Sequence, residues 1–176
     1  MIASVLILLW LGPASAELNA PEKNVPPSQL DQQDLRRVAE KLKTAILKED
    51  IDGILRHIDP DGLRCTDTKV PYQQVRRDLH NKNSDLYLSL FDTARFFKRC
   101  GRGYPSDYPA ISDREFFSRA ENETIEIEIS ERNKDRAKVT IRSSVKGHYP
   151  RELYFHKVAG KWKVSQGFIV GSCTCG

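Results

Sequence analysis

The segment TIEIEISERNKDRAKVTIRSS, residues 124–144, decides the fold class of this chain. In its first third isoleucines alternate with glutamates, and from Ala137 onward apolar residues again take every second position. A period of two residues is typical of a β-strand that buries one face and exposes the other. Asn133-Lys134-Asp135 between the two runs is a turn signal, so the segment predicts two antiparallel strands joined by a short turn.

Two further strands are predicted toward the C-terminus. Leu153 and Phe155 continue the alternation, and Ala159-Gly160-Lys161 predicts a tight hairpin that leads into Trp162 and Val164. Four strands joined by short turns predict an antiparallel meander with one apolar face, and that face needs a cover.

The cover is predicted in the N-terminal half of the chain. Apolar residues recur with helical spacing over Leu35–Ile46, in a helix that begins near Ser28 or Asp31. A second helix is predicted from about Ile51 and ends at the turn Asp59-Pro60-Asp61-Gly62.

The middle of the chain is predicted to hold further helices at about 72–83 and at Ser84–Leu90. Residues 99–113 read as a long loop, after which Ser112 or Asp113 caps a short helix. Helices first and a sheet afterwards indicate the α+β class. We expect N-terminal helices packed on a curved antiparallel sheet of about four C-terminal strands.

Residues 1–16 read as a secretory signal peptide. Met1 to Leu11 is almost wholly apolar, Gly12-Pro13 ends the run, and Ala14-Ser15-Ala16 fits a small-x-small cleavage site. The run is too short to cross about 30 Å of hydrocarbon, so no membrane span is expected after cleavage. We therefore expect a secreted or periplasmic protein with a flexible lead-in at residues 17–30 and a single domain at residues 31–176.

The chain has four cysteines, Cys65, Cys100, Cys173 and Cys175. An even number in an exported protein predicts disulfides. Cys173 and Cys175 are too near in sequence to bond each other easily, which favours bonds from this tail to Cys65 and Cys100. Both such pairings stay open, and Cys65–Cys100 with Cys173–Cys175 fits the geometry least. A zinc site is disfavoured because C-x-C is not the usual zinc spacing, and a redox dithiol is disfavoured because no C-x-x-C opens a helix.

Charge and motif content narrow the function classes. The chain has 28 basic and 24 acidic residues, an excess of four positive charges that is weak evidence for a polyanionic partner. Basic residues flank two aromatic residues in RFFKRCGR, residues 95–102, but Lys and Arg stems also cover apolar neighbours, so no nucleic-acid partner is expected. No phosphate-binding glycine loop, hydrolase elbow or H-E-x-x-H occurs, and no cofactor or metal is expected.

Two segments resemble a known superfamily. They are LKEDIDGILRHIDPDGL, from Leu47 to Leu63, and the hairpin LYFHKVAGKWKV, from Leu153 to Val164. Both are similar to segments of the nuclear-transport-factor-2-like (NTF2-like, SnoaL-like) α+β superfamily. The resemblance implies a cone-shaped, cystatin-like roll with a pocket inside. That superfamily includes isomerases, dehydratases, hydrolases and non-catalytic binding modules, so the resemblance implies no single activity.

Six residues are candidates for lining such a pocket. His57 lies near two aspartates, as in an acid–base pair, although a histidine at a helix C-terminus is also stabilised by the helix dipole. His156 is placed by alternation on the polar side of its strand. The full candidate set is His57, Tyr87, Asp92, Tyr104, Tyr108 and His156.

The sequence favours a secreted or periplasmic binding or interaction domain without catalytic activity. Its pocket would take a small apolar ligand or a segment of a protein partner. The competing hypothesis is a small lyase or isomerase that uses a pocket His or Asp as general base. A homodimer is a further arrangement that the sequence leaves open.

Overall fold

The computed structural model describes residues 27–65, 68–100, 111–119, 123–144 and 149–168. These residues form an α+β fold, as predicted. The helices are α1 (Pro27–Leu47), α2 (Ile51–Leu55), α3 (Tyr72–His80), α4 (Asp85–Phe91), α5 (Thr93–Cys100) and α6 (Asp113–Arg119). The strands are β1 (Leu63–Cys65), β2 (Thr68–Val70), β3 (Glu123–Ile129), β4 (Arg136–Ser143), β5 (Arg151–Val158) and β6 (Lys161–Gln166).

The described strands form one mixed sheet in the order β2-β1-β6-β5-β4-β3. The predicted meander is confirmed, because β3, β4, β5 and β6 pair antiparallel in sequence order. The predicted number of about four strands is wrong, since β1 and β2 extend the sheet beyond β6. Each of these two strands has only three residues, and β1 pairs parallel with β6 near the other end of the chain. A strand this short shows no alternation, and local sequence carries no signal for so distant a partner.

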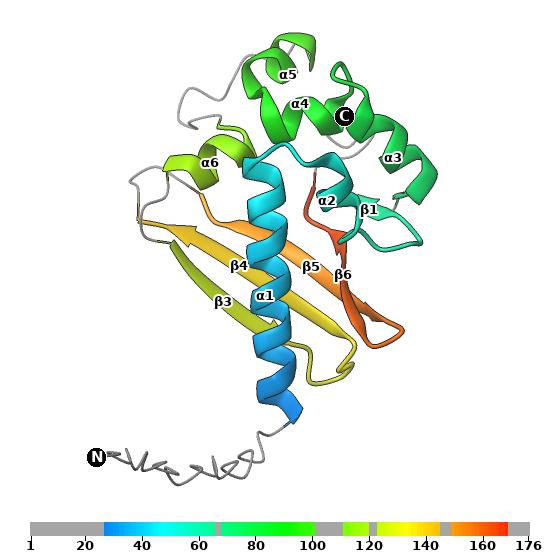
Figure 1. Cartoon of the computed structure of the whole chain (residues 1–176), viewed down its shortest axis with the longest axis vertical. Helices are drawn as coiled ribbons and strands as arrows, with labels where there is room; N and C mark the ends of the chain where they lie inside the picture. The colour runs from blue at the N-terminus through cyan, green and yellow to red at the C-terminus, as the bar shows by residue number, and fades with distance from the viewer. Residues whose placement is uncertain (1–26, 66–67, 101–110, 120–122, 145–148, 169–176) are drawn as a thin grey trace, which may run out of the picture.

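The helix α1 runs across one face of the sheet and supplies the centre of the core (Figure 1). Leu35, Ala39, Leu42 and Ile46 lie on one stripe of this helix and are fully or almost fully buried. Full burial of one Leu or Ile side chain contributes about 1.5–3 kcal/mol. The strands complete the core with the apolar residues that alternation predicted, namely Ala137, Val139, Ile141, Leu153, Phe155, Trp162 and Val164.

The helix α1 begins at Pro27, inside the segment predicted as a lead-in. Lys157 on β5 joins the first turns of this helix to the sheet. Its Nζ lies 2.6 Å from Oδ1 of Asp31 and 4.7 Å from the ring centroid of Trp162. The predicted signal peptide lies outside the described residues. Within the described part of the chain, no helix has both the length and the apolar character needed to cross a bilayer.

The helices α3, α4, α5 and α6 gather at one end of the sheet (Figure 1). The serine Ser84 caps α4 through a bond from the Tyr87 N–H to its Oγ. Ser112 caps α6 in the same way through the Glu115 N–H, which confirms the predicted short helix. The loop predicted over residues 99–113 starts too early, because α5 continues to Cys100. The interior of that segment, residues 101–110, lies outside the described residues.

Candidate functional site

The space between α1 and the sheet is filled by side chains. Among the described residues, the cavity found there has a volume of ≈ 10 Å³, which holds one water molecule at most. Asp113 and Arg151 border it as an ion pair, with Oδ1 and Nε 2.7 Å apart. Burial raises the pKa of Asp113, and the Arg151 charge opposes that rise. The apolar pocket predicted between helices and sheet is therefore not found in the part of the chain that the structure describes.

A pocket of ≈ 520 Å³ lies instead on the opposite face of the sheet. We call it the outer-face pocket. Its lining comes from all six strands and from the turn Asp59–Gly62 that precedes β1. Among the described residues, the hollow thus lies on the polar side of the sheet and not in the interior that the resemblance implies.

Strand register explains how the lining is assembled. One residue from each strand pairs across the sheet in a single line, which we call the outer-face row: Lys69, Arg64, Gln166, Tyr154, Lys138 and Glu128. Direct cross-strand partners share a face of the sheet. Their neighbours along the strands, among them Leu63, Ala137 and Phe155, are buried in the core, so the row faces away from α1.

A histidine and a carboxylate meet beside this row. Nδ1 of His156 lies 3.3 Å from Oδ2 of Asp59. The Asp59 side chain is only 6% exposed, whereas that of His156 is 46% exposed. His156 therefore lies on the polar side of β5, as alternation predicted. In the neutral tautomer with its proton on Nδ1, the ring donates to Asp59 and Nε2 is available as an acceptor.

The position of Asp59 is set by a tight turn. Its Oδ1 accepts a bond from the Asp61 N–H at 2.8 Å, and its carbonyl oxygen accepts one from the Gly62 N–H at 2.8 Å. Gly62 has a φ of +102°, and a Cβ at that position would lie 2.0 Å from the Val70 carbonyl oxygen. The turn therefore requires glycine, and it holds the Asp59 carboxylate rigidly at the edge of the pocket.

The charges in the outer-face pocket are of both signs. Lys69 Nζ lies 3.0 Å from Oδ2 of Asp61. Lys138 Nζ lies between two carboxylates, 3.6 Å from Glu128 and 3.8 Å from Glu152. These pairs are partly exposed, and each contributes little to stability. They nevertheless neutralise both lysines of the pocket.

Tyr154 lies at the centre of the row on β5, with 37% of its surface exposed. Its hydroxyl donates to Oε2 of Glu152 at 3.2 Å. Partial burial raises the pKa of Tyr154, and the bond to Glu152 raises it further. The phenol is thus a neutral hydrogen-bonding group at the middle of the pocket, and its ring offers an apolar surface to an occupant.

A second hollow, of ≈ 510 Å³, lies beside α5 and is lined by fewer residues. Its arginines are already paired. Arg95 lies 3.8 Å from Asp92, and Arg99 lies 3.5 Å from Asp85. Because these ion pairs stabilise the helical end of the domain, we do not take this hollow as the functional site.

His57 does not join the outer-face pocket. It follows α2, and its backbone carbonyl accepts a bond from the Val164 N–H at 2.7 Å. Partial burial lowers the pKa of His57, and the cations Lys163, Lys41 and Arg56 lower it further. The predicted partner Asp59 pairs with His156 instead.

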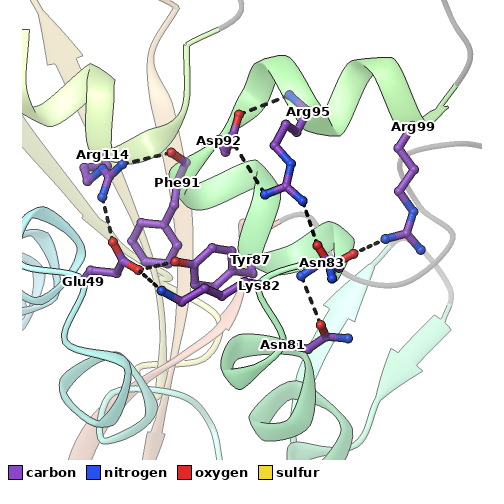
Figure 2. A network of polar contacts seen from close by, with 10 residues as sticks. All are labelled: Glu49, Asn81, Lys82, Asn83, Tyr87, Phe91, Asp92, Arg95, Arg99 and Arg114. Atoms are coloured by element: carbon purple, nitrogen blue, oxygen red, sulfur yellow. Dashed lines mark hydrogen bonds and ion pairs between the residues drawn. The ribbon is translucent and has the colours of Figure 1, made fainter.

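Tyr87 and Asp92 lie in a polar network at the helical end of the domain (Figure 2), and neither lines the outer-face pocket. The Tyr87 hydroxyl donates to Oε1 of Glu49, and Nη1 of Arg114 lies 2.8 Å from Oε2 of the same residue. Burial, followed by the bond to Glu49, raises the pKa of Tyr87 to about 12. Asp92 accepts a bond from the Arg95 N–H and so caps α5. Both residues have structural roles in this network.

The other predicted site residues lie outside what the structure describes. Tyr104, Tyr108, Cys173 and Cys175 fall outside the described residues, and for Cys65 and Cys100 the description covers the backbone alone. The predicted disulfides therefore remain a prediction.

Sequence reasoning missed the cations of the pocket, Arg64, Lys69, Arg136 and Lys138. Alternation places Arg136 and Lys138 on the polar side of β4, a signal that was present in the sequence. The residues of β1 and β2 could not be placed, because their position depends on the parallel pairing of Arg64 with Gln166.

No protein-family model matches the chain, and no curated protein matches it. Among solved structures, the chain is similar to an NTF2-like designed protein, with 15% sequence identity and a TM-score of 0.39. The match covers 77% of this chain and 96% of that chain. At this TM-score the likeness carries no argument about fold, ligand or activity.

Proposed function

We propose that this domain binds a small polar molecule in the outer-face pocket. The observation that carries the proposal is the convergence of all six strands on one concave surface of ≈ 520 Å³. Binding sites of this volume, with a few convergent polar groups, suit small ligands. The lining is rich in hydrogen-bonding groups, and Tyr154 adds an exposed aromatic ring. A polar ligand therefore replaces the apolar one that the sequence suggested.

The domain acts outside the cytosol in this proposal. The support is the apolar run of residues 1–11 with its small-residue cleavage site, together with four cysteines suited to cross-linking. Mass spectrometry of the natural mature protein should find Glu17 at its N-terminus and no free thiol. A chain that retains Met1 would contradict this part of the proposal.

A second candidate is general acid–base catalysis by His156. The specific observation in its favour is the buried Asp59 carboxylate at 3.3 Å from Nδ1, an arrangement that orients a histidine base. His156 was among the residues predicted for the lyase or isomerase hypothesis, and it is the one that this arrangement supports. In that case His156→Gln would lower turnover about a hundredfold or more while ligand binding persisted. If the chain shows no turnover and His156→Gln only weakens ligand binding, the result favours the binding domain.

A thermal-shift screen of the mature chain tests the binding proposal. We expect a polar compound to raise the melting temperature, since a ligand at about 100 times its Kd adds about 2.7 kcal/mol. For a domain of this size each kcal/mol corresponds to roughly 2–4 °C. The rise should be lost in Tyr154→Ala and kept in Tyr149→Ala, which removes another exposed tyrosine outside the pocket lining. A response to apolar compounds alone, or one that Tyr154→Ala leaves intact, contradicts the proposal.

A further inference from the structure

Among the described residues that line the outer-face pocket, two arginines lie outside its ion pairs. Lys69 and Lys138 are paired with carboxylates, as described above. Arg64 and Arg136 also line the pocket and are exposed. Within the described part of the chain, neither guanidinium has a carboxylate within ion-pair distance. The pocket therefore presents two cations to whatever occupies it.

These two arginines lie at opposite ends of the pocket. Arg64 is on β1 and Arg136 on β4, with β6 and β5 between them. Three inter-strand spacings of about 4.8 Å, combined with the offset of Arg136 by two residues along β4 from the row member Lys138, separate their backbones by about 16 Å. When both side chains stand off the sheet, one compact anion cannot contact both guanidiniums, whereas an elongated molecule with an acidic group at each end can.

The strands between the two arginines offer uncharged groups, and the one nearby carboxylate among the described lining residues, Asp59, is in contact with His156, the cross-strand partner of Arg136. Gln166 on β6 and Tyr154 on β5 are consecutive members of the outer-face row. Ser165 joins them in the lining and donates through Oγ to the Tyr154 carbonyl oxygen at 3.2 Å. An amide, a hydroxyl and an aromatic ring suit the uncharged body of a ligand, and not a third acidic group.

We propose that the outer-face pocket binds an elongated dicarboxylate, an inference that rests on the proposed binding function. One carboxylate is held by Arg64 and the other by Arg136, while the body of the ligand lies over Gln166 and Tyr154. A guanidinium has a planar fork of donors that matches the two oxygens of a carboxylate. A single guanidinium at each end also balances the single charge of a carboxylate better than the higher charge of a phosphate.

Calorimetric titration with matched ligands tests this inference. The probes are α,ω-dicarboxylates of increasing chain length, the half-amide of each, which lacks one charge, and the corresponding diamide. We expect one chain length to bind best and to bind about tenfold or more tighter than its half-amide, as the loss of one charge-assisted contact implies. Its affinity should also fall as salt is raised.

Variants of the two arginines test whether each guanidinium holds one carboxylate of the ligand. In Arg64→Gln or Arg136→Gln the dicarboxylate should bind no tighter than its half-amide. Arg142→Gln is the matched control, because Arg142 lies on the same strand and face as Arg136 but does not line the pocket. Equal unfolding midpoints for the three variants show that each is folded.

The outcomes separate this inference from the proposed function. If the half-amide and diamide bind as tightly as the dicarboxylate, the pocket is a binding site and the ligand class is wrong. If no compound of the series binds while the thermal screen finds another polar ligand, the class is again wrong and the binding function stands. If neither experiment finds a ligand, both are overturned.

Discussion

Asp59 and His156, ninety-seven positions apart in sequence, meet at 3.3 Å between Oδ2 and Nδ1 at the edge of the outer-face pocket. One partner is held by a glycine-dependent turn before β1, and the other lies on a central strand. The contact therefore fixes the turn against the sheet and orients the imidazole toward the pocket.

This contact should appear as a coupling between the two residues. Asp59→Asn and His156→Gln should each destabilise the domain by about 1–3 kcal/mol, because each leaves a buried or partly buried polar group without its partner. The double variant should lose less than the sum, with a coupling of about 0.5–3 kcal/mol. Urea unfolding of the four proteins gives this cycle. Strict additivity would show that the two side chains do not interact in solution.

Tyr87 should titrate late because its phenol donates to Glu49 in a buried setting. Its pKa of about 12 lies above the ordinary value of 10, so between these pH values the folded state holds a proton that the unfolded state has released. Stability therefore falls as pH rises through this range. Absorbance of tyrosinate should show a late component that Tyr87→Phe removes. In Glu49→Gln that component should move toward lower pH, and an unchanged titration in both variants would contradict the network of Figure 2.

His57 should make the domain less stable in mild acid. Because burial and three nearby cations lower its pKa below 6.5, the unfolded state binds the proton more readily than the folded state. Stability is then complete above the unfolded pKa and is lost as pH falls below it. Free energies of unfolding at neutral pH and at about pH 5 measure this loss. His57→Gln should reduce the difference between the two, and an unchanged difference would contradict this account.

The core between α1 and the sheet should carry most of the stability. Leu42 is fully buried, and Leu42→Ala should cost about 2–5 kcal/mol by the loss of its contacts and the cavity left behind. Leu30 on the same helix is 50% exposed, and Leu30→Ala should change the free energy of unfolding by about 0.5 kcal/mol or less. Similar effects at both positions would contradict the packing of α1 on the sheet.

Local periodicity predicted those helices and strands in which apolar residues recur at a regular spacing. The alternation of Ile125, Ile127 and Ile129 predicted β3, and the helical spacing from Leu35 to Ile46 predicted α1. Both patterns arise because one face of the element meets the core. The three-residue strands β1 and β2 are too short to show such a pattern, and the sheet was therefore predicted two strands too small.

The candidate site was predicted only in part for the same reason. His156 was placed on the polar side of its strand, and its partner Asp59 was recognised as part of a turn. Their meeting depends on tertiary pairing, namely the parallel contact of residues 58 and 64 with β6. Arg64 entered the site through that pairing, which no local pattern records.

The central claim is that the polar outer face of the sheet, and not the packed interior, receives a ligand. Amide chemical shifts of the ¹⁵N-labelled mature chain, titrated with the compound that most raises its melting temperature, test it directly. We predict that the shifted amides cluster at Arg64, Arg136, Tyr154 and Gln166, with Leu42 and Phe117 unmoved. Shifts that instead cluster around Leu42 and Phe117, beneath α1, would contradict the claim.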